Sequence, residues 1–142
     1  MRQIKFRAQR LDNGKWVYGD LEHNPGNKIT RIHTYDSKGE YEGQHIVIPE
    51  SVCQFTGLTD CNGKEIYEGD ILKVTQIRPK DSPPIDRGIH VVKFCPWYGW
   101  SLGTDKVRYE VEAKSRLGFI DRVEVIGNIH DNPEQINQPT EV

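Results

Sequence analysis

Long apolar runs are absent from this sequence of 142 residues. No stretch approaches the roughly 20 consecutive apolar residues that a membrane-spanning helix needs. The opening segment Met1–Arg7 alternates charged and apolar side chains, so it lacks the apolar centre of a signal peptide. We therefore expect a cytoplasmic protein with no membrane partner.

Cysteine is scarce, and the motifs of common catalytic and metal sites are missing. Cys53, Cys61 and Cys95 form no C-x-x-C pair, and the five histidines form no H-E-x-x-H motif. Neither the nucleophile motif G-x-S-x-G nor the phosphate loop G-x-x-x-x-G-K-[ST] occurs. The sequence predicts no catalytic residue, no metal site and no cofactor, and hence a protein that is not an enzyme.

Neither sign of charge dominates. The chain carries 19 Lys and Arg against 21 Asp and Glu, a formal net charge of −2. Proteins that grip a nucleic-acid backbone depend on clustered Lys and Arg that release counterions, so this balance weakens a nucleic-acid function. A chain of this length buries about 68% of its unfolded surface, which suffices for a core without disulfides or metals.

The pattern of apolar residues favours β-structure. Residues 3–21 are predicted to form a hairpin, because Ile4–Ala8 alternate, Asn13-Gly14 suits a tight turn and Trp16–Tyr18 are typical strand residues. Helical periodicity extends over no more than about two turns in any window. Further strand signals recur at 30–35, 45–48, 52–55, 69–77, 89–94, 107–112 and 122–127.

The segments between these strands are punctuated by proline and glycine. Residues 22–43 give the weakest signal, and a helix or a disordered loop is an alternative to strands there. Residues 78–88 contain three prolines and predict an exposed loop that joins two strands. Pro133–Ile136 is predicted to begin one helical turn before a frayed tail.

Four blocks of sequence resemble the YopX-like family of phage and prophage proteins: 1–8, 54–58, 60–71 and 125–134. They read MRQIKFRA, QFTGL, DCNGKEIYEGDI and VIGNIHDNPE, and they spread over nearly the whole chain. The resemblance implies a small, mainly β phage-encoded protein from a family without an established activity or known catalytic residues. Cys53, Cys61 and His130 depart from the residues expected in the family, which argues against a shared catalytic role for them.

The expected fold is mainly β, with one or more small β-barrels and little helix. The segment after Tyr67 resembles the diverging turn of SH3-like barrels, an analogy at the level of fold alone. We expect an N-terminal β subdomain over 1–55, an SH3-like subdomain over 56–135 and a frayed tail over 136–142. The two subdomains packing as one domain is the alternative.

Two groups of residues are candidate binding sites. Aromatic rings concentrate in 94–100, where Trp97, Tyr98 and Trp100 form an exposed binding surface or, alternatively, fill the core or a subunit interface. The basic side chains of the long loop would serve a nucleic acid: Arg78, Lys80 and Arg87. An oxygen-rich cluster over 60–70 misses the EF-hand spacing and is explained better by turn and capping chemistry.

These observations favour a non-enzymatic accessory protein that binds or assembles with another protein. The expected partners are further copies of the chain and an unidentified host or phage protein, reached through strand edges or the aromatic segment. A nucleic-acid-binding β-barrel is the alternative.

Overall fold

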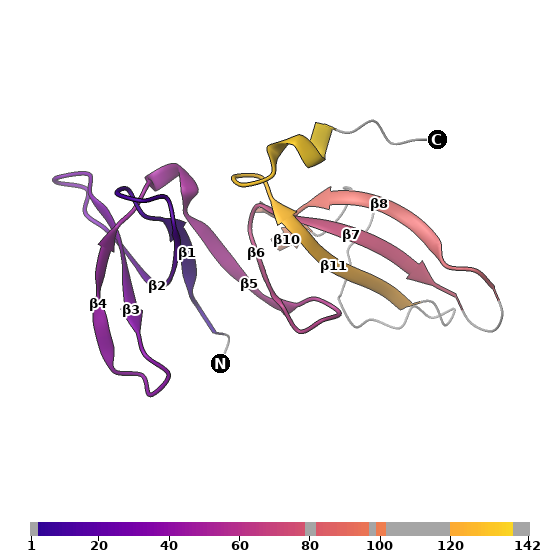
Figure 1. Ribbon diagram of the computed structural model, residues 1–142, viewed down its shortest axis with the longest axis horizontal. Coiled ribbons are helices and arrows are strands. Elements are labelled where there is room, and N and C mark those ends of the chain that lie inside the picture. Colours follow the sequence, from indigo (N-terminus) through magenta and orange to yellow (C-terminus); the bar gives the residue numbers. More distant parts are fainter. Residues whose placement is uncertain (1–2, 79–81, 97–98, 102–119, 138–142) are drawn as a thin grey trace. The chain divides into compact units, whose positions relative to one another are not determined.

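The computed structural model describes residues 3–78, 82–96, 99–101 and 120–137 (Figure 1). Strands make up nearly all of its regular structure, with two short 3-10 turns, so the prediction of a mainly β protein with little helix is confirmed. In the described part of the chain, no helix has the length and apolar character to cross a membrane. The chain divides into two compact units, Met1–Gly57 and Leu58–Val142.

The first unit is an antiparallel sheet of consecutive strands (Figure 1). Its strands are β1 (Phe6–Gln9), β2 (Trp16–His23), β3 (Thr30–Tyr35), β4 (Tyr41–Ile46) and the beginning of β5 (Cys53–Thr59). In space they follow the order β4-β3-β2-β1-β5, with β4 at the edge. The expected hairpin over 3–21 is present as β1 and β2. Residues 22–43, where the sequence pattern is weakest, form the end of β2, all of β3 and the beginning of β4, together with the two turns that join these strands.

Strand β2 changes its partner halfway along. Residues Trp16–Gly19 pair with β1, whereas Asp20–His23 pair with β3. The core of the unit lies on one face of these strands, around the fully buried side chains of Ala8, Ile32 and Val47. Because strand side chains alternate between faces, the residues in between project from the opposite face.

A 3-10 turn, η1 (Pro49–Ser51), ties the chain after β4 to β1. The buried Ser51 hydroxyl accepts a hydrogen bond from the Gln9 N–H at 2.8 Å and donates one to the Ile48 carbonyl at 2.6 Å. An isolated bridge between Arg10 and Val47 adds a second link. These contacts hold the end of β1 against the continuation of β4.

The second unit contains two further sheets. Its remaining elements are β6 (Glu65–Tyr67), β7 (Asp70–Ile77), β8 (Ile85–Val91), β9 (Lys93–Cys95), β10 (Gly99–Ser101), β11 (Ile120–Asn128) and η2 (Pro133–Asn137). Strand β7 lies between β11 and β8, β9 pairs with β10, and β6 neighbours β5. The apolar core comprises Ile66, Leu72, Val74, Val92 and Val123.

The second unit departs from the predicted fold in two respects. Within the described residues the sheets are open, so the expected closed barrel is not found. Strand β8 begins at Ile85, inside the predicted loop 78–88, because Ile85 and Asp86 pair with β7 despite the prolines before them. The strand predicted over 107–112 lies outside the described residues, and the predicted turn after Pro133 is present as η2.

Two of the four sequence blocks, 60–71 and 125–134, contain turns of the second unit. The Asp60 carboxylate accepts hydrogen bonds from Asn62 N–H and Lys64 N–H, both at 2.9 Å, and from Val125 N–H at 3.0 Å. The buried Asp70 carboxylate accepts one from Tyr67 N–H at 2.7 Å. The oxygen-rich cluster therefore contains turn-forming carboxylates, as the capping interpretation predicts.

The Asn128–Asn132 turn packs closely over Gly127. A Cβ atom on Gly127 would lie 2.5 Å from Asn132 Oδ1 and 2.8 Å from Gln135 Oε1. Because both obstacles are the ends of side chains, we expect Gly127→Ala to lower the free energy of unfolding by about 1–2 kcal/mol rather than to prevent folding. Urea unfolding measures this loss. In an Asn132→Ala background the same substitution should lower the free energy of unfolding by less, because the nearest obstacle has been removed. An unchanged midpoint would contradict the prediction.

Candidate protein-binding face

The outward face of β2, β3 and β4 collects aromatic and charged side chains. The core-facing residues of these strands, such as Leu21 and Ile32, alternate with residues that project the other way. The register places Asp20 opposite His33, Glu22 opposite Arg31, and Tyr35 opposite Tyr41. We call this surface the tyrosine face; its residues are Tyr18, Asp20, Glu22, Arg31, His33, Tyr35, Tyr41, Gln44 and Ile46.

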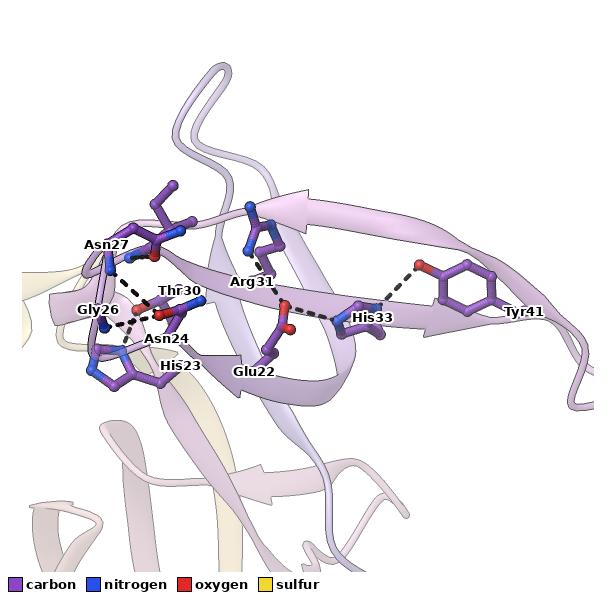
Figure 2. A network of polar contacts seen from close by, with 10 residues as sticks. Glu22, His23, Asn24, Gly26, Asn27, Thr30, Arg31, His33 and Tyr41 are labelled. Carbon is purple, nitrogen blue, oxygen red and sulfur yellow. Dashed lines mark hydrogen bonds and ion pairs between the residues drawn. The ribbon is translucent and has the colours of Figure 1, made fainter.

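His33 lies at the centre of a polar chain across three strands (Figure 2). Its Nε2 is 3.3 Å from Glu22 Oε2, and its Nδ1 is 3.1 Å from the Tyr41 hydroxyl. A neutral imidazole with its proton on Nε2 satisfies both contacts, because Nε2–H donates to the carboxylate and Nδ1 accepts from the phenol. Arg31 Nη1 approaches the same Glu22 oxygen at 3.5 Å.

Tyr35 and Tyr41 form an aromatic pair beside His33. Their ring centroids are 5.7 Å apart at an interplanar angle of 66°, an edge-to-face geometry. Partial desolvation raises the pKa of the Tyr35 phenol, and the Asp20 carboxylate raises it further through its charge and a hydrogen bond. The Tyr35 hydroxyl therefore keeps its proton at neutral pH.

The turn between β2 and β3 is held by its own side chains (Figure 2). Asn24 Oδ1 accepts from Gly26 N–H at 2.9 Å, and Asn27 Oδ1 accepts from Ile29 N–H at 3.0 Å. At the other end of β3, Asp36 Oδ1 accepts from Lys38 N–H and Glu40 N–H at 2.8 and 2.9 Å. Such side-chain-to-backbone bonds define the turns and therefore the spacing of the three strands.

The aromatic segment 94–100 is described in part. Trp97 and Tyr98 lie outside the described residues. Trp100 is partly buried and packs against the second unit's core, and it stacks edge-to-face on Phe94 with centroids 5.1 Å apart. Phe94 itself is exposed.

The predicted basic residues are engaged in local contacts where they are described. Arg78 donates from Nε and Nη2 to the Pro83 carbonyl at 3.1 and 3.0 Å, and Arg87 donates to Gln76 Oε1 at 2.7 Å. Lys80 lies outside the described residues. The two arginines brace the β7–β8 connection, while both side chains keep solvent access.

Sequence reasoning overlooked the tyrosine face because its residues come from the stretch with the weakest pattern. The signal was the alternation of Tyr18, Asp20 and Glu22 with smaller or apolar residues, and of Arg31, His33 and Tyr35 with Ile32 and Thr34. Two such alternating runs predict one solvated sheet face. Only the register of three strands shows that the rings share it.

Comparison with known proteins supplies one identification. No curated protein matches the chain. The family model described as YopX protein matches residues 5–137, the span that includes both units' described strands. The resemblance of the sequence blocks is thereby confirmed, and this chain belongs to the YopX family.

Proposed function

We propose that the chain is a non-enzymatic accessory protein of a phage or prophage, which binds another protein through the tyrosine face. The observation that carries the proposal is the exposure of four large side chains on this one surface. Tyr18, Tyr35, Tyr41 and Ile46 are 48%, 46%, 57% and 46% exposed. Tyrosine is enriched in protein interfaces, where its ring supplies contact area and its hydroxyl a hydrogen bond.

The rigidity of the tyrosine face supports this role. The His33 contact holds the Tyr41 hydroxyl, and the Tyr35 ring packs edge-to-face against the Tyr41 ring. Side chains that are already ordered lose little conformational entropy when a partner binds, so more of the contact energy appears as affinity.

Charge favours a protein over a nucleic acid as the partner. The tyrosine face carries the carboxylates of Asp20 and Glu22 against the single guanidinium of Arg31. A phosphate backbone would be repelled by this surface rather than attracted. The alternative function, a nucleic-acid-binding β-barrel, depends instead on Arg78, Lys80 and Arg87, and its test is salt-sensitive binding of DNA or RNA.

The proposal includes the expected setting of the protein. We propose that it works in the host cytoplasm and forms homo-oligomers, and that the second unit belongs to the SH3-like class of small barrels. The central position of β7 between β8 and β11 and the tight Tyr67–Asp70 turn support the last point.

Capture of partners by the Tyr35→Ser/Tyr41→Ser double variant tests the proposed function. We expect a protein that binds the wild-type chain to bind this variant about 100-fold more weakly, since two central interface tyrosines contribute roughly 3 kcal/mol. The measurement is capture from host lysate, followed by titration of each purified captured protein.

The matched control is Ile89→Ser, which removes an exposed apolar side chain from β8 in the second unit. A partner that binds the double variant as tightly as the wild type, or that is lost only with Ile89→Ser, would contradict a role for the tyrosine face. Co-elution of salt-sensitive nucleic acid would favour the alternative function.

A further inference from the structure

Strand β4 is the edge of its sheet, and the hydrogen-bond pattern shows which of its backbone groups point outward. Val47 N–H donates to the Thr30 carbonyl at 3.0 Å, so this pair is bonded across to β3. Bonded and non-bonded pairs alternate in an antiparallel ladder. Counting from Val47, the backbone groups of Ile46 and Gln44 point away from β3. The bond from Leu11 N–H to the Ile46 carbonyl at 3.0 Å agrees with this count.

In the part of the chain that the structure describes, the outer edge of β4 is covered at one end only. Beside Ile46 and Ile48 it is occupied by the end of β1, through the Leu11 bond and a bond from Ile48 N–H to the Gln9 carbonyl at 2.9 Å. The chain then turns away at Asp12. Among the described residues, none bonds the outward backbone groups of Gln44.

A hollow lies at the point where the segment after β1 stops covering the outer edge of β4. It has a volume of about 350 Å³ and is lined by Arg10, Leu11, Asp12, Gln44, His45 and Ile46. Leu11, which is 64% exposed, and Ile46 give it apolar surface. On its rim, the Arg10 guanidinium donates from Nε and Nη2 to the two Asp12 carboxylate oxygens at 3.0 and 2.6 Å. The volume is in the range of small binding pockets and admits an apolar side chain.

The segment that forms this edge carries acidic side chains and no Lys or Arg. From Gly39 to Gly63 the chain contains no Lys or Arg, whereas Glu40, Glu42 and Glu50 fall within or next to β4 and η1. Edge strands are commonly protected from pairing by lysine, and β4 has none. A second copy of β4 would add its own Glu40 and Glu42 to an edge that already carries both, and like charges are unfavourable where they come close across strands.

We propose that the β4 edge accepts an extended basic segment of a partner protein as an added strand, with one apolar side chain in the hollow beside Leu11. The backbone of Gln44 supplies one donor and one acceptor, and the acidic edge attracts Lys or Arg on the added strand. The inference rests on the proposed function and deepens it, since a strand added at β4 extends the tyrosine face.

A peptide titration followed by amide NMR of the full-length chain tests this site. The probe is the acetylated, amidated peptide Lys-Val-Lys-Leu-Lys-Val. One control has Glu in place of every Lys, and another carries N-methyl groups on alternate amides. We expect the amide signals of Leu11, Gln44 and Ile46 to shift with the basic peptide, and both controls to bind about tenfold more weakly.

Two variants separate the backbone contact from the hollow. Gln44→Pro removes an outward N–H and leaves the inner ladder bonds in place, and Leu11→Ser removes an exposed apolar group. Each should weaken binding of the basic peptide about tenfold, as one lost backbone bond or apolar contact implies, while Ile89→Ser leaves it unchanged.

Equal binding of the three peptides, or shifts confined to other residues, would overturn the proposal. Shifts of the same amides on concentrating the chain without peptide would also overturn it, because they would assign the edge to a second copy. The tyrosine double variant distinguishes the two proposals. If it loses a captured partner that Gln44→Pro retains, the tyrosine face is the binding surface and the added strand is wrong.

Discussion

The Gly19→Ala substitution is expected to destabilise the first unit by about 3 kcal/mol or more. Gly19 lies where β2 leaves β1 and begins to pair with β3. A Cβ atom there would lie 1.9 Å from the carbonyl oxygen of His33 and 2.9 Å from its carbonyl carbon. These atoms belong to the backbone of β3, so relief requires the strands to separate.

Urea unfolding followed by far-UV circular dichroism measures this loss, and amide exchange shows whether it is confined to the first unit. Gly26→Ala is the matched control, because its φ is not positive and the nearest atom to its added Cβ, at 3.2 Å, is the side-chain oxygen of Asn24. We expect the control to change stability by less than about 1 kcal/mol. If Gly19→Ala behaves like Gly26→Ala, the close approach of β3 to β2 is wrong.

The second large effect is expected at Asp60. Asp60→Ala leaves three N–H groups without their acceptor, those of Asn62, Lys64 and Val125. Since hydrogen bonds to a charged group are worth about 1.5–3 kcal/mol each and water replaces some of them, we expect a loss of about 3–4 kcal/mol. Asp60→Asn should cost about 2 kcal/mol, because its NH₂ group would face the Val125 N–H.

The stability that Asp60 contributes is expected to fall at acid pH. Burial acts to raise the pKa of this carboxyl group, but the N–H donors of Val125, Lys64 and Asn62 and the Lys64 charge hold it below its ordinary value. The unfolded chain therefore binds a proton at a higher pH than the folded chain does. The contribution is complete above about pH 4 and is lost as the pH falls through the lower pKa of the folded state.

Urea unfolding at a series of pH values between neutrality and pH 2 tests both statements about Asp60. The wild type should lose stability over the acid range more steeply than Asp60→Asn, in which this group cannot titrate. Asp86→Asn is the control at neutral pH, since the exposed Asp86 of β8 accepts one N–H bond, from Gly88, and an amide oxygen can replace the carboxylate there. Parallel acid profiles of wild type and Asp60→Asn would show that Asp60 does not carry the effect.

The local part of the structure was predictable because local chemistry determines it. The hairpin at Asn13-Gly14 follows from the positive φ of Gly14, and the turn at Asp60 follows from short-range side-chain bonds. The same holds for the turn after Pro133. In contrast, the sequence predicts this strand only from residue 89, whereas β8 begins at Ile85. Proline restrains the residues next to it but does not prevent strand pairing immediately after it.

The tyrosine face was not predictable in the same way. The rings of Tyr35 and Tyr41 come from strands joined by a turn, yet their contact depends on a register shift between Thr34 and Tyr35. One residue of slip would exchange the two faces of β4 and remove Tyr41 from His33. The hollow beside Leu11 likewise requires the bridge between Arg10 and Val47, which are distant in sequence.

The sequence by itself determined the class of this protein: mainly β strands separated by specific turns, balanced charge and membership of the YopX family. Alternation and turn preferences act between residues a few positions apart, so they can be recognised in a single chain. Tertiary structure alone decided which strand is the edge, which rings share a face and where the hollow lies. Those features depend on strand order and register, which are set by packing between distant segments.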